Sequence, residues 1–273
     1  MSGTLFIVAT PIGNLGDMTP RALDVLREVD FVAAEDSRVA LKLLSCFDIS
    51  KPVVSYHEHN KYDVGPKILQ RIENGENCAL TTDAGMPAVS DPGCELVCAC
   101  HAASIPVTVL PGASAVVCAV ALSGFAARRF CFEGFLPTDG SGRAAALARS
   151  AAFEGCLVFY EAPHRLRKTL VELADVLGDM PTAVIKEISK IHETVNVTSL
   201  AAAAKNPDYE QPKGEFVIVI DNSPPPAPPA LQEALEFARE LIALGVTPSD
   251  AAKYAAKKLG AKKNEVYAAL CAQ

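Results

Sequence analysis

Residues 78–93 read CALTTDAGMPAVSDPG and join a short apolar run to a loop that is rich in glycine and proline. The run at 78–82 predicts a buried β-strand, because it is apolar and is followed by residues typical of turns. Glycines in the loop let main-chain groups approach a ligand closely, and prolines hold the loop still. The carboxylate of Asp83 can accept hydrogen bonds from a ribose hydroxyl or an ammonium group. We therefore expect a strand that ends in a ligand-binding loop.

Three further predicted strands are followed by loops of the same kind. These loops are 10–17 (TPIGNLGD), 111–115 (PGASA) and 160–165 (YEAPHR). Any one of them is typical of a tight turn in a β-α unit, but four at strand ends favour a ligand cleft. The sequence contains neither G-x-G-x-x-G nor G-x-x-x-x-G-K-[ST] at these loops. This argues against a nicotinamide enzyme and against a P-loop nucleotidase.

Strand and helix patterns alternate through most of the chain, which predicts the α/β class. Residues 1–117 are expected to form one domain with a mainly parallel sheet covered on both faces, and residues 118–222 a second domain with a more mixed sheet. Ligands of such sheets bind at the carboxyl ends of the strands. Thr19 and Pro20 are typical of the start of a helix. The expected strands are 5–9, 31–34, 52–55, 78–82, 107–110, 129–133, 156–160, 183–186, 194–197 and 215–220, and the helices of the second domain are 143–153 and 165–177.

A proline-rich segment at 223–229 predicts a stiff, extended linker. Beyond it, residues 230–273 are expected to form a small helical module, in which Thr247 and Pro248 begin one helix and Gly260 ends it. The module carries a cluster of lysines, which are Lys253, Lys257, Lys258, Lys262 and Lys263. A lysine cluster of this kind is typical either of a solvated helix face or of a module that contacts phosphates, and the spacing of the lysines leaves both interpretations open.

The composition is that of a folded protein that needs no disulfide bonds and has no membrane-spanning helix. The 273 residues carry a net charge of −7, which argues against holding nucleic acid by overall charge but leaves room for a local basic patch. No apolar run reaches the roughly 20 residues of a membrane helix, and the start has no positive region of a secretion signal. The 9 cysteines are expected to be buried thiols in a reducing, cytoplasmic compartment. The Cys94, Cys98, Cys100 and His101 group matches no zinc spacing, so we expect no metal.

Two further predicted strands are followed by several polar residues, more than an ordinary turn needs. Glu35, Asp36 and Arg38 follow the second predicted strand, and the string SYHEHN at 55–60 follows the third. Histidines are usually packing or surface residues, but two that flank a glutamate at the ligand-binding edge of a sheet suggest function. Consecutive residues rarely converge on one ion, which argues against a metal site here.

The ordered strings together resemble the ribosomal RNA small subunit methyltransferase I family, which methylates the ribose 2′-oxygen of a cytidine in 16S ribosomal RNA. This family lies within the tetrapyrrole-methylase-like (class III methyltransferase) enzymes. The match runs in order from residue 4 to about residue 220, and a helical tail follows. The strings are TPIGNLGD, AAEDSR, SYHEHN, DAGMPAVSDPG, PGASA, FEGFLP, FYEAPHR and KGEFVIV.

The resemblance implies two α/β domains with S-adenosylmethionine in the cleft between them, usually in a homodimer. It also implies transfer to a cytidine in the decoding region, with free 16S RNA or the 30S subunit as partner. Three positions depart from the family pattern: Ser37 and Met86 each replace a common threonine, and Lys186 replaces an arginine. A hydroxyl contact at Met86 and a bidentate contact at Lys186 are therefore not expected. The residues implied to meet the cofactor are Pro11, Asp83, Ala84, Met86, Ser114, Ala115, Tyr160 and Gly214.

The chemistry needs a group that removes the proton of the 2′-hydroxyl, and it needs no metal. We predict His57 as this general base, oriented by Glu58 or Asp36. The residues expected to face or hold the RNA are Glu35, Arg38, His59, Arg165, Lys257 and Lys258. Two alternatives stay open: a sibling enzyme that methylates a tetrapyrrole or a modified histidine, and a non-catalytic S-adenosylmethionine-binding factor for ribosome assembly.

Overall fold

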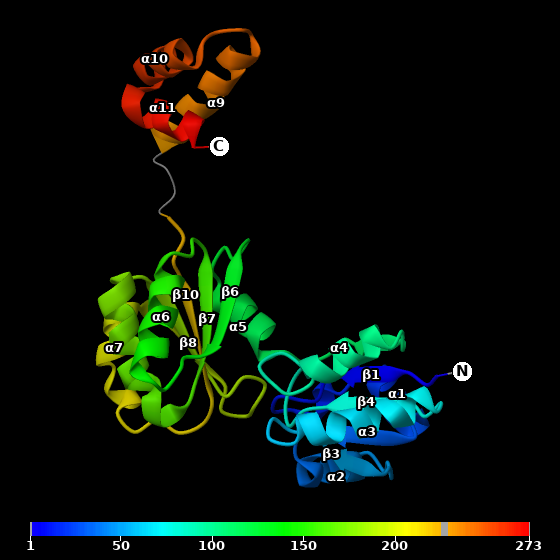
Figure 1. Ribbon diagram of the computed structural model, residues 1–273. Coiled ribbons are helices and arrows are strands. Elements are labelled where there is room, and N and C mark those ends of the chain that lie inside the picture. Colours follow the sequence, from blue (N-terminus) through cyan, green and yellow to red (C-terminus); the bar gives the residue numbers. More distant parts are fainter. Residues whose placement is uncertain (1, 225–228, 273) are drawn as a thin grey trace. The chain divides into compact units, whose positions relative to one another are not determined.

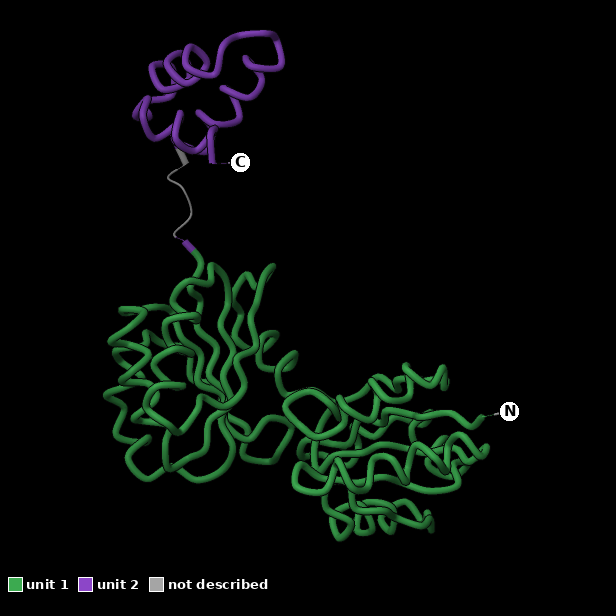
Figure 2. Tube along the Cα trace, viewed as in Figure 1, with its two compact units in different colours: residues 1–223 green, residues 224–273 purple. Residues whose placement is uncertain are grey.

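The computed structural model describes residues 2–224 and 229–272. The chain forms two compact units, one up to Ser223 and one from Pro224 onward, which Figure 2 distinguishes by colour. The proline-rich linker expected at 223–229 falls largely on residues 225–228, which lie outside the described residues.

The first sheet of the larger unit is entirely parallel, as predicted (Figure 1). Its strands lie in the order β3-β2-β4-β1-β5. Both faces of this sheet are covered, so its central strands read as short continuous apolar runs in the sequence. The strands are β1 (Leu5–Val8), β2 (Phe31–Ala34), β3 (Val53–Ser55), β4 (Cys78–Thr81) and β5 (Val107–Leu110).

Helices cover both faces of this sheet. Successive residues of a strand point to opposite faces, and both sets of side chains in the central strands are apolar and have to be buried. In β2, Val32 and Ala34 pack in one core and Phe31 and Ala33 in another. The first core receives α1 (Pro20–Glu28) and α2 (Ser37–Cys46), and the second receives α3 (Lys61–Glu73) and α4 (Cys94–Ala102). The predicted start of α1 is confirmed, since the Ala22 amide donates to the Thr19 hydroxyl at 3.2 Å. The short 3-10 helix η1 (Leu15–Asp17) follows β1.

The second sheet is mixed, as predicted, with order β6-β7-β10-β8-β9. The β6–β7 pair is parallel and the other pairs are antiparallel. One face carries α6, α7 and α8, whose apolar residues form a single core with the sheet. The elements are β6 (Phe130–Phe135), α6 (Gly140–Ala151), β7 (Cys156–Glu161), η2 (Pro163–Arg165), α7 (Leu166–Leu177), β8 (Pro181–Lys186), β9 (Thr194–Ser199), α8 (Leu200–Lys205), η3 (Pro207–Tyr209) and β10 (Phe216–Asp221).

Helix α5 (Ala115–Ser123) belongs to the second sheet. Its residues Val116 and Ala119 are buried against β7, β8 and β10, on the face opposite α7. The expected boundary between the α/β domains, at residue 117, falls inside this helix. We therefore place the boundary before Ala115, because a helix goes with the sheet on which it packs.

The smaller unit is helical. It consists of α9 (Pro229–Ala243), α10 (Pro248–Leu259) and α11 (Lys263–Cys271). Alanines at its centre, such as Ala234, Ala238 and Ala252, let the helices approach closely. The predicted limits of α10 are confirmed: the hydroxyl of Thr247 caps its start, and Gly260 ends it in the left-handed conformation at φ 72°.

The expectation that the cysteines are buried is wrong for Cys46, Cys94, Cys98 and Cys271, which are exposed. On α4 the residues that face the core are Leu96 and Cys100, one turn apart, which leaves Cys94 and Cys98 toward solvent. In the described parts of the chain no three or more His, Cys, Asp or Glu side chains are grouped to hold a metal. Nor does any described helix have the length and apolar character to cross a membrane.

Candidate active site

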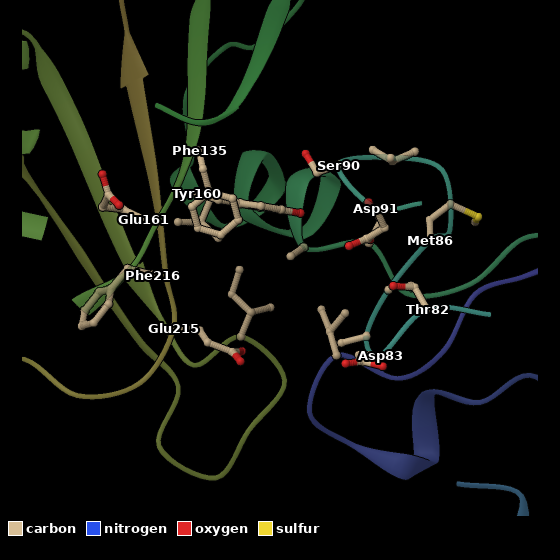
Figure 3. A pocket seen from close by; sticks show the side chains of 18 of the residues that line it. Thr82, Asp83, Met86, Ser90, Asp91, Phe135, Tyr160, Glu161, Glu215 and Phe216 are labelled. Atoms are coloured by element: carbon tan, nitrogen blue, oxygen red, sulfur yellow. The ribbon is translucent and has the colours of Figure 1, made fainter. Parts of the chain in front are cut away.

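The larger unit contains a cavity of about 450 Å³ where both sheets end (Figure 3). On the first sheet it meets the loops that follow β1, β4 and β5, and on the second sheet it meets β7, β10 and the loop after β8. It therefore lies at the carboxyl ends of parallel strands, as expected for α/β sheets. Its lining residues are Ile12, Glu35, Thr82, Asp83, Ala84, Gly85, Met86, Val89, Ser90, Asp91, Ser114, Ala115, Phe135, Tyr160, Glu161, Ala162, Pro163, Ile188, Glu215, Phe216 and Val217.

Direct hydrogen bonds join the loops after β1 and β4. Thr10 and Gly85 exchange two backbone bonds, of 2.9 Å and 3.0 Å, as an isolated antiparallel bridge. The Thr10 hydroxyl also donates to the carbonyl oxygen of Thr82 at 3.1 Å. The two loops therefore form one continuous wall of the cavity.

The loop at 83–93 is held in a strained conformation. Ala88 and Ser90 have φ angles of 64° and 65°, a region that residues with side chains enter rarely. Gly93 lies at φ 145°, and a Cβ there would be only 2.9 Å from Leu80 Cδ2 and 3.1 Å from Ala88 Cβ. The left-handed conformations of Ala88 and Ser90 cost about 1–3 kcal/mol each and persist only where neighbouring structure imposes them. The backbone conformation of this loop therefore sets the orientation of the Ser90 and Asp91 side chains.

Five carboxylates line the cavity, whereas its described lining contains no lysine, arginine or histidine. Two of the five are paired: Glu161 with Arg165 at 2.7 Å and Glu215 with a lysine at 2.9 Å. The other three are Glu35, Asp83 and Asp91, and they leave this part of the cavity negative. A positively charged ligand is therefore favoured there.

The three unpaired carboxylates differ in their surroundings. Glu35 accepts a hydrogen bond from the Thr82 hydroxyl at 2.7 Å, and Asp83 accepts one from the Asp36 backbone amide at 3.1 Å. Burial raises the pKa of Asp83 above its usual range. Burial also raises the pKa of Asp91, to about 6, with the charges of Glu35 and Asp83 adding to the effect and the Thr82 hydroxyl opposing it.

Aromatic and apolar side chains form the wall from the second sheet. Tyr160 packs edge-on between Phe132 and Phe135, at centroid distances of 4.8 Å and 5.6 Å. Burial raises the pKa of Tyr160 to about 12, so its hydroxyl stays protonated and can donate. Ile188 and Val217 extend this apolar surface, which suits a flat ring system.

The loop after β8 reaches across to the loop after β1. Lys190 donates to Glu187 and Glu215, both at 2.9 Å, and Ser189 donates to Asp17. Gly13 lets the chains come this close, since a Cβ there would lie 2.4 Å from Lys190 Cγ. This contact places Ile188 and Glu215 in the cavity wall.

Most residues expected to meet a cofactor do line the cavity: Asp83, Ala84, Met86, Ser114, Ala115 and Tyr160. Pro11 and Gly214 are not in the lining, although their neighbours Ile12 and Glu215 are. Gly214 has φ 98° and lies against Glu187, where a Cβ would be 2.7 Å from Oε1. Its role is therefore to permit a close backbone turn before β10.

The expected base and its partners lie elsewhere. His57, Glu58 and Asp36 are not in the cavity lining, and His57 Nδ1 is buried without a hydrogen-bond partner among the described residues. Glu58 pairs instead with Lys61 at 2.7 Å. Asp36 caps α2 and pairs with Arg38 at 2.6 Å, which lowers its pKa to about 2. Both carboxylates are thus paired with basic residues near them in the chain, and the orientation of His57 by either one stays a prediction.

The residues expected to contact RNA are scattered. Glu35 is in the cavity lining, Arg38 is exposed on α2, and His59 is exposed with its ring 6.0 Å from that of His57. The Arg165 guanidinium donates to the buried Glu161, and its expected contact with RNA stays a prediction. Lys257 and Lys258 lie on α10 of the smaller unit, where they line an apolar groove with Phe237, Leu241, Val246 and Tyr254.

Several lining residues were not singled out from the sequence. Asp91 and Ser90 belong to the quoted loop at 83–93, so their types and position were visible there. Glu215 likewise belongs to the quoted string KGEFVIV. Ile188 carried no such signal, because the pairing of β8 with β10 brings it to the cavity.

Comparison with known proteins agrees with this arrangement. Residues 4–204 match the family of Tetrapyrrole (Corrin/Porphyrin) Methylases. Among solved structures, diphthine synthase is similar at a TM-score of 0.63 and 16% identity, covering 80% of this chain and 90% of that one. The uroporphyrin-III C-methyl transferase of Thermus thermophilus, solved with S-adenyl homocysteine, gives 0.58 and 19%, covering 81% and 98%. At these identities the similarity establishes the fold.

Sequence relatives match over nearly their whole length. The chain is 43% identical over 268 residues to the ribosomal RNA small subunit methyltransferase I of Synechocystis sp., covering 97% of this chain and 96% of that protein. It is 39% identical over 271 residues to the Bacillus subtilis protein of the same name, covering 97% and 93%. The chain therefore belongs to the ribosomal RNA small subunit methyltransferase I family, within the tetrapyrrole methylases.

Proposed function

We propose that this protein methylates the ribose 2′-oxygen of a cytidine in the decoding region of 16S ribosomal RNA. The coarser activity, S-adenosylmethionine-dependent methylation of ribosomal RNA, follows from membership of the family. The observation that carries the proposal is the acidic, partly apolar cavity at the strand ends of both sheets. The choice of cytidine and of the decoding region rests on the sequence strings that resemble the family.

The cavity suits S-adenosylmethionine, the methyl donor. Its volume of about 450 Å³ falls within the usual range for small-molecule sites. Asp83 can accept hydrogen bonds from ribose hydroxyls, while Ile12 and Ile188 offer apolar contact to a purine. When bound, this cofactor supplies a methyl group on a positively charged sulfur, and unpaired carboxylates favour that charge. We assign cofactor contacts to Asp83, Ala84, Met86, Ser114, Ala115 and Tyr160.

The RNA is held, in this proposal, by exposed groups outside the cavity. Arg38 and His59 lie near the carboxyl ends of β2 and β3, and Arg38 is 88% exposed in its side chain. The smaller unit adds Lys257 and Lys258 beside the exposed ring of Tyr254, a combination that suits phosphates and bases. Lysines there supply affinity that does not depend on RNA sequence.

We also propose a homodimer in the cytoplasm. Exposed apolar residues such as Val117 on α5 and Val109 on the edge strand β5 support a second copy as partner, since they are 60% and 50% exposed. The cytoplasm is where 16S RNA and 30S subunits occur.

Transfer of radiolabelled methyl groups tests the function. The purified chain and labelled S-adenosylmethionine are incubated with 30S subunits, free 16S RNA and a tetrapyrrole mixture in separate reactions. The labelled RNA is then digested to nucleosides. We expect label in 2′-O-methylcytidine, and the stronger of the two RNA reactions identifies the partner. Label only in the pigment would contradict the proposal, and a bound cofactor without any labelled product would favour a non-catalytic assembly factor.

A further inference from the structure

Of the carboxylates in the cavity, Asp91 has the fewest interactions with other described residues. Glu161 and Glu215 are paired with Arg165 and Lys190. Glu35 and Asp83 accept hydrogen bonds from the Thr82 hydroxyl and from a backbone amide. No salt bridge of the described residues involves Asp91; the Thr82 hydroxyl lies close enough to lower its pKa, but the hydrogen bond of that hydroxyl at 2.7 Å goes to Glu35. Asp91 is therefore free to accept a proton from a ligand.

The position of Asp91 is fixed by the strained loop. Ser90, its neighbour, has φ 65°, and its Oγ lies 3.2 Å from the place of a Cβ at Gly134 in β6. Figure 3 shows the Asp91 side chain projecting into the cavity and facing Tyr160 from the opposite sheet. A general base has to be held in this way, because proton transfer requires hydrogen-bond distance to the reacting group.

The surroundings give Asp91 the basicity that this role needs. The titratable groups that face it are Glu35 and Asp83 from the first sheet and Tyr160 from the second. Burial and the two negative charges raise the pKa of Asp91 to about 6. A carboxyl group with that pKa is mostly ionised at neutral pH, yet it binds a proton far better than an ordinary aspartate, and a general base works best with a pKa near the operating pH.

We propose that Asp91 is the general base that removes the proton of the acceptor ribose hydroxyl. The inference rests on the proposed function, and it replaces His57, which is not in the cavity lining. In the step, the O2′–H bond breaks and its proton passes to the Asp91 carboxylate. The 2′-oxygen forms a bond to the methyl carbon, and the electron pair of the broken carbon–sulfur bond remains on sulfur. The Asp91 proton is then released to water.

The test compares Asp91→Asn with Asp91→Glu and with Asp175→Asn, an exposed aspartate on α7 that serves as the matched control. Calorimetry measures binding of S-adenosylhomocysteine, and single-turnover transfer to RNA is followed from pH 5 to pH 9. We expect D91N to bind S-adenosylhomocysteine within about threefold of the unmodified protein and to lose about 10²–10⁴-fold in transfer rate. The rate of the unmodified protein falls tenfold per pH unit below about pH 6, the pKa of Asp91, and this limb is absent in D91N. D91E recovers part of the rate, and D175N matches the unmodified protein.

Three results would overturn the inference. A normal rate and pH profile in D91N would show that another group takes the proton, and a larger loss in His57→Ala would return that role to His57. Loss of S-adenosylhomocysteine binding in proportion to the rate would show that Asp91 binds the cofactor instead. If the unmodified protein itself transfers no methyl group to RNA, the proposed function fails and this inference with it, a result that the first three cannot mimic.

Discussion

Replacing Glu161 by alanine should destabilise the larger unit more than the loss of any exposed ion pair. The Glu161 side chain is fully buried, and Arg165 beside it is 20% exposed. The carboxylate accepts from Arg165 Nε and the Ala162 amide, both at 2.8 Å, and from the Thr169 hydroxyl. Its removal leaves a guanidinium without its partner in a site largely closed to water, which costs about 3–5 kcal/mol.

This magnitude is large against the roughly 5–15 kcal/mol by which folded domains are stable. For a unit of this size it corresponds to a fall in melting temperature of roughly 6–20 °C. The assay is thermal unfolding followed by circular dichroism. The matched control is Glu210→Ala, which removes an Arg167 pair of the same 2.7 Å length whose side chains are 50% and 59% exposed. Its effect should stay below about 1 kcal/mol.

A double variant separates the buried charge from the lost contacts. Glu161→Met with Arg165→Met removes both charges together, and apolar replacement of a whole buried pair is often neutral. We therefore expect the double variant to be more stable than E161A. Equal melting temperatures for E161A and E210A, or a double variant less stable than E161A, would refute the reasoning that the buried guanidinium depends on Glu161.

Three other predictions follow from the structure. Gly13→Ala places a Cβ 2.4 Å from Lys190 Cγ, so it should displace the loop after β8 and weaken S-adenosylhomocysteine binding several-fold by calorimetry; unchanged affinity would mean that this contact does not shape the cavity. The raised pKa of Asp91, about 6 against a usual 3.8, means that its protonated form favours folding below about pH 4 and that this stability is lost as the pH rises through 6. The melting temperature of D91N should therefore gain on that of the unmodified protein between pH 4 and pH 6.5, and parallel curves would contradict the shift. Removing residues 224–273 should leave S-adenosylhomocysteine binding intact but weaken RNA binding and flatten its salt dependence; an unchanged salt slope would exclude the smaller unit from RNA contact.

Features with a local cause were predictable from the sequence. Alternate residues of β2 pack in two different cores, Val32 and Ala34 in one and Phe31 and Ala33 in the other. An apolar run in a parallel sheet that is covered on both faces requires this. Helix limits at Thr19, Thr247 and Gly260 follow from capping chemistry. The loops at strand ends likewise placed most of the cavity wall correctly, since parallel strands end at a common edge.

Features that depend on distant parts of the chain were not predictable. Arg165 looked like a free cation until packing of β7 against β10 and α7 buried its partner Glu161. The register of β8 and β10, which pairs Lys186 with Phe216, brings Ile188 to the cavity and cannot be read from either segment alone. The position of Asp36 has a local explanation instead, since it lies where a helix cap is expected.

Restoration of a missing modification in cells tests the central claim most directly. The chain is expressed in a bacterial strain that lacks its own member of this family, and nucleosides from purified 16S RNA are quantified by mass spectrometry. We predict that 2′-O-methylcytidine, absent from the 16S RNA of the deleted strain, returns with the unmodified chain and stays near the background with D91N. A 16S RNA that remains unmodified while the expressed chain is folded and binds S-adenosylhomocysteine would contradict it.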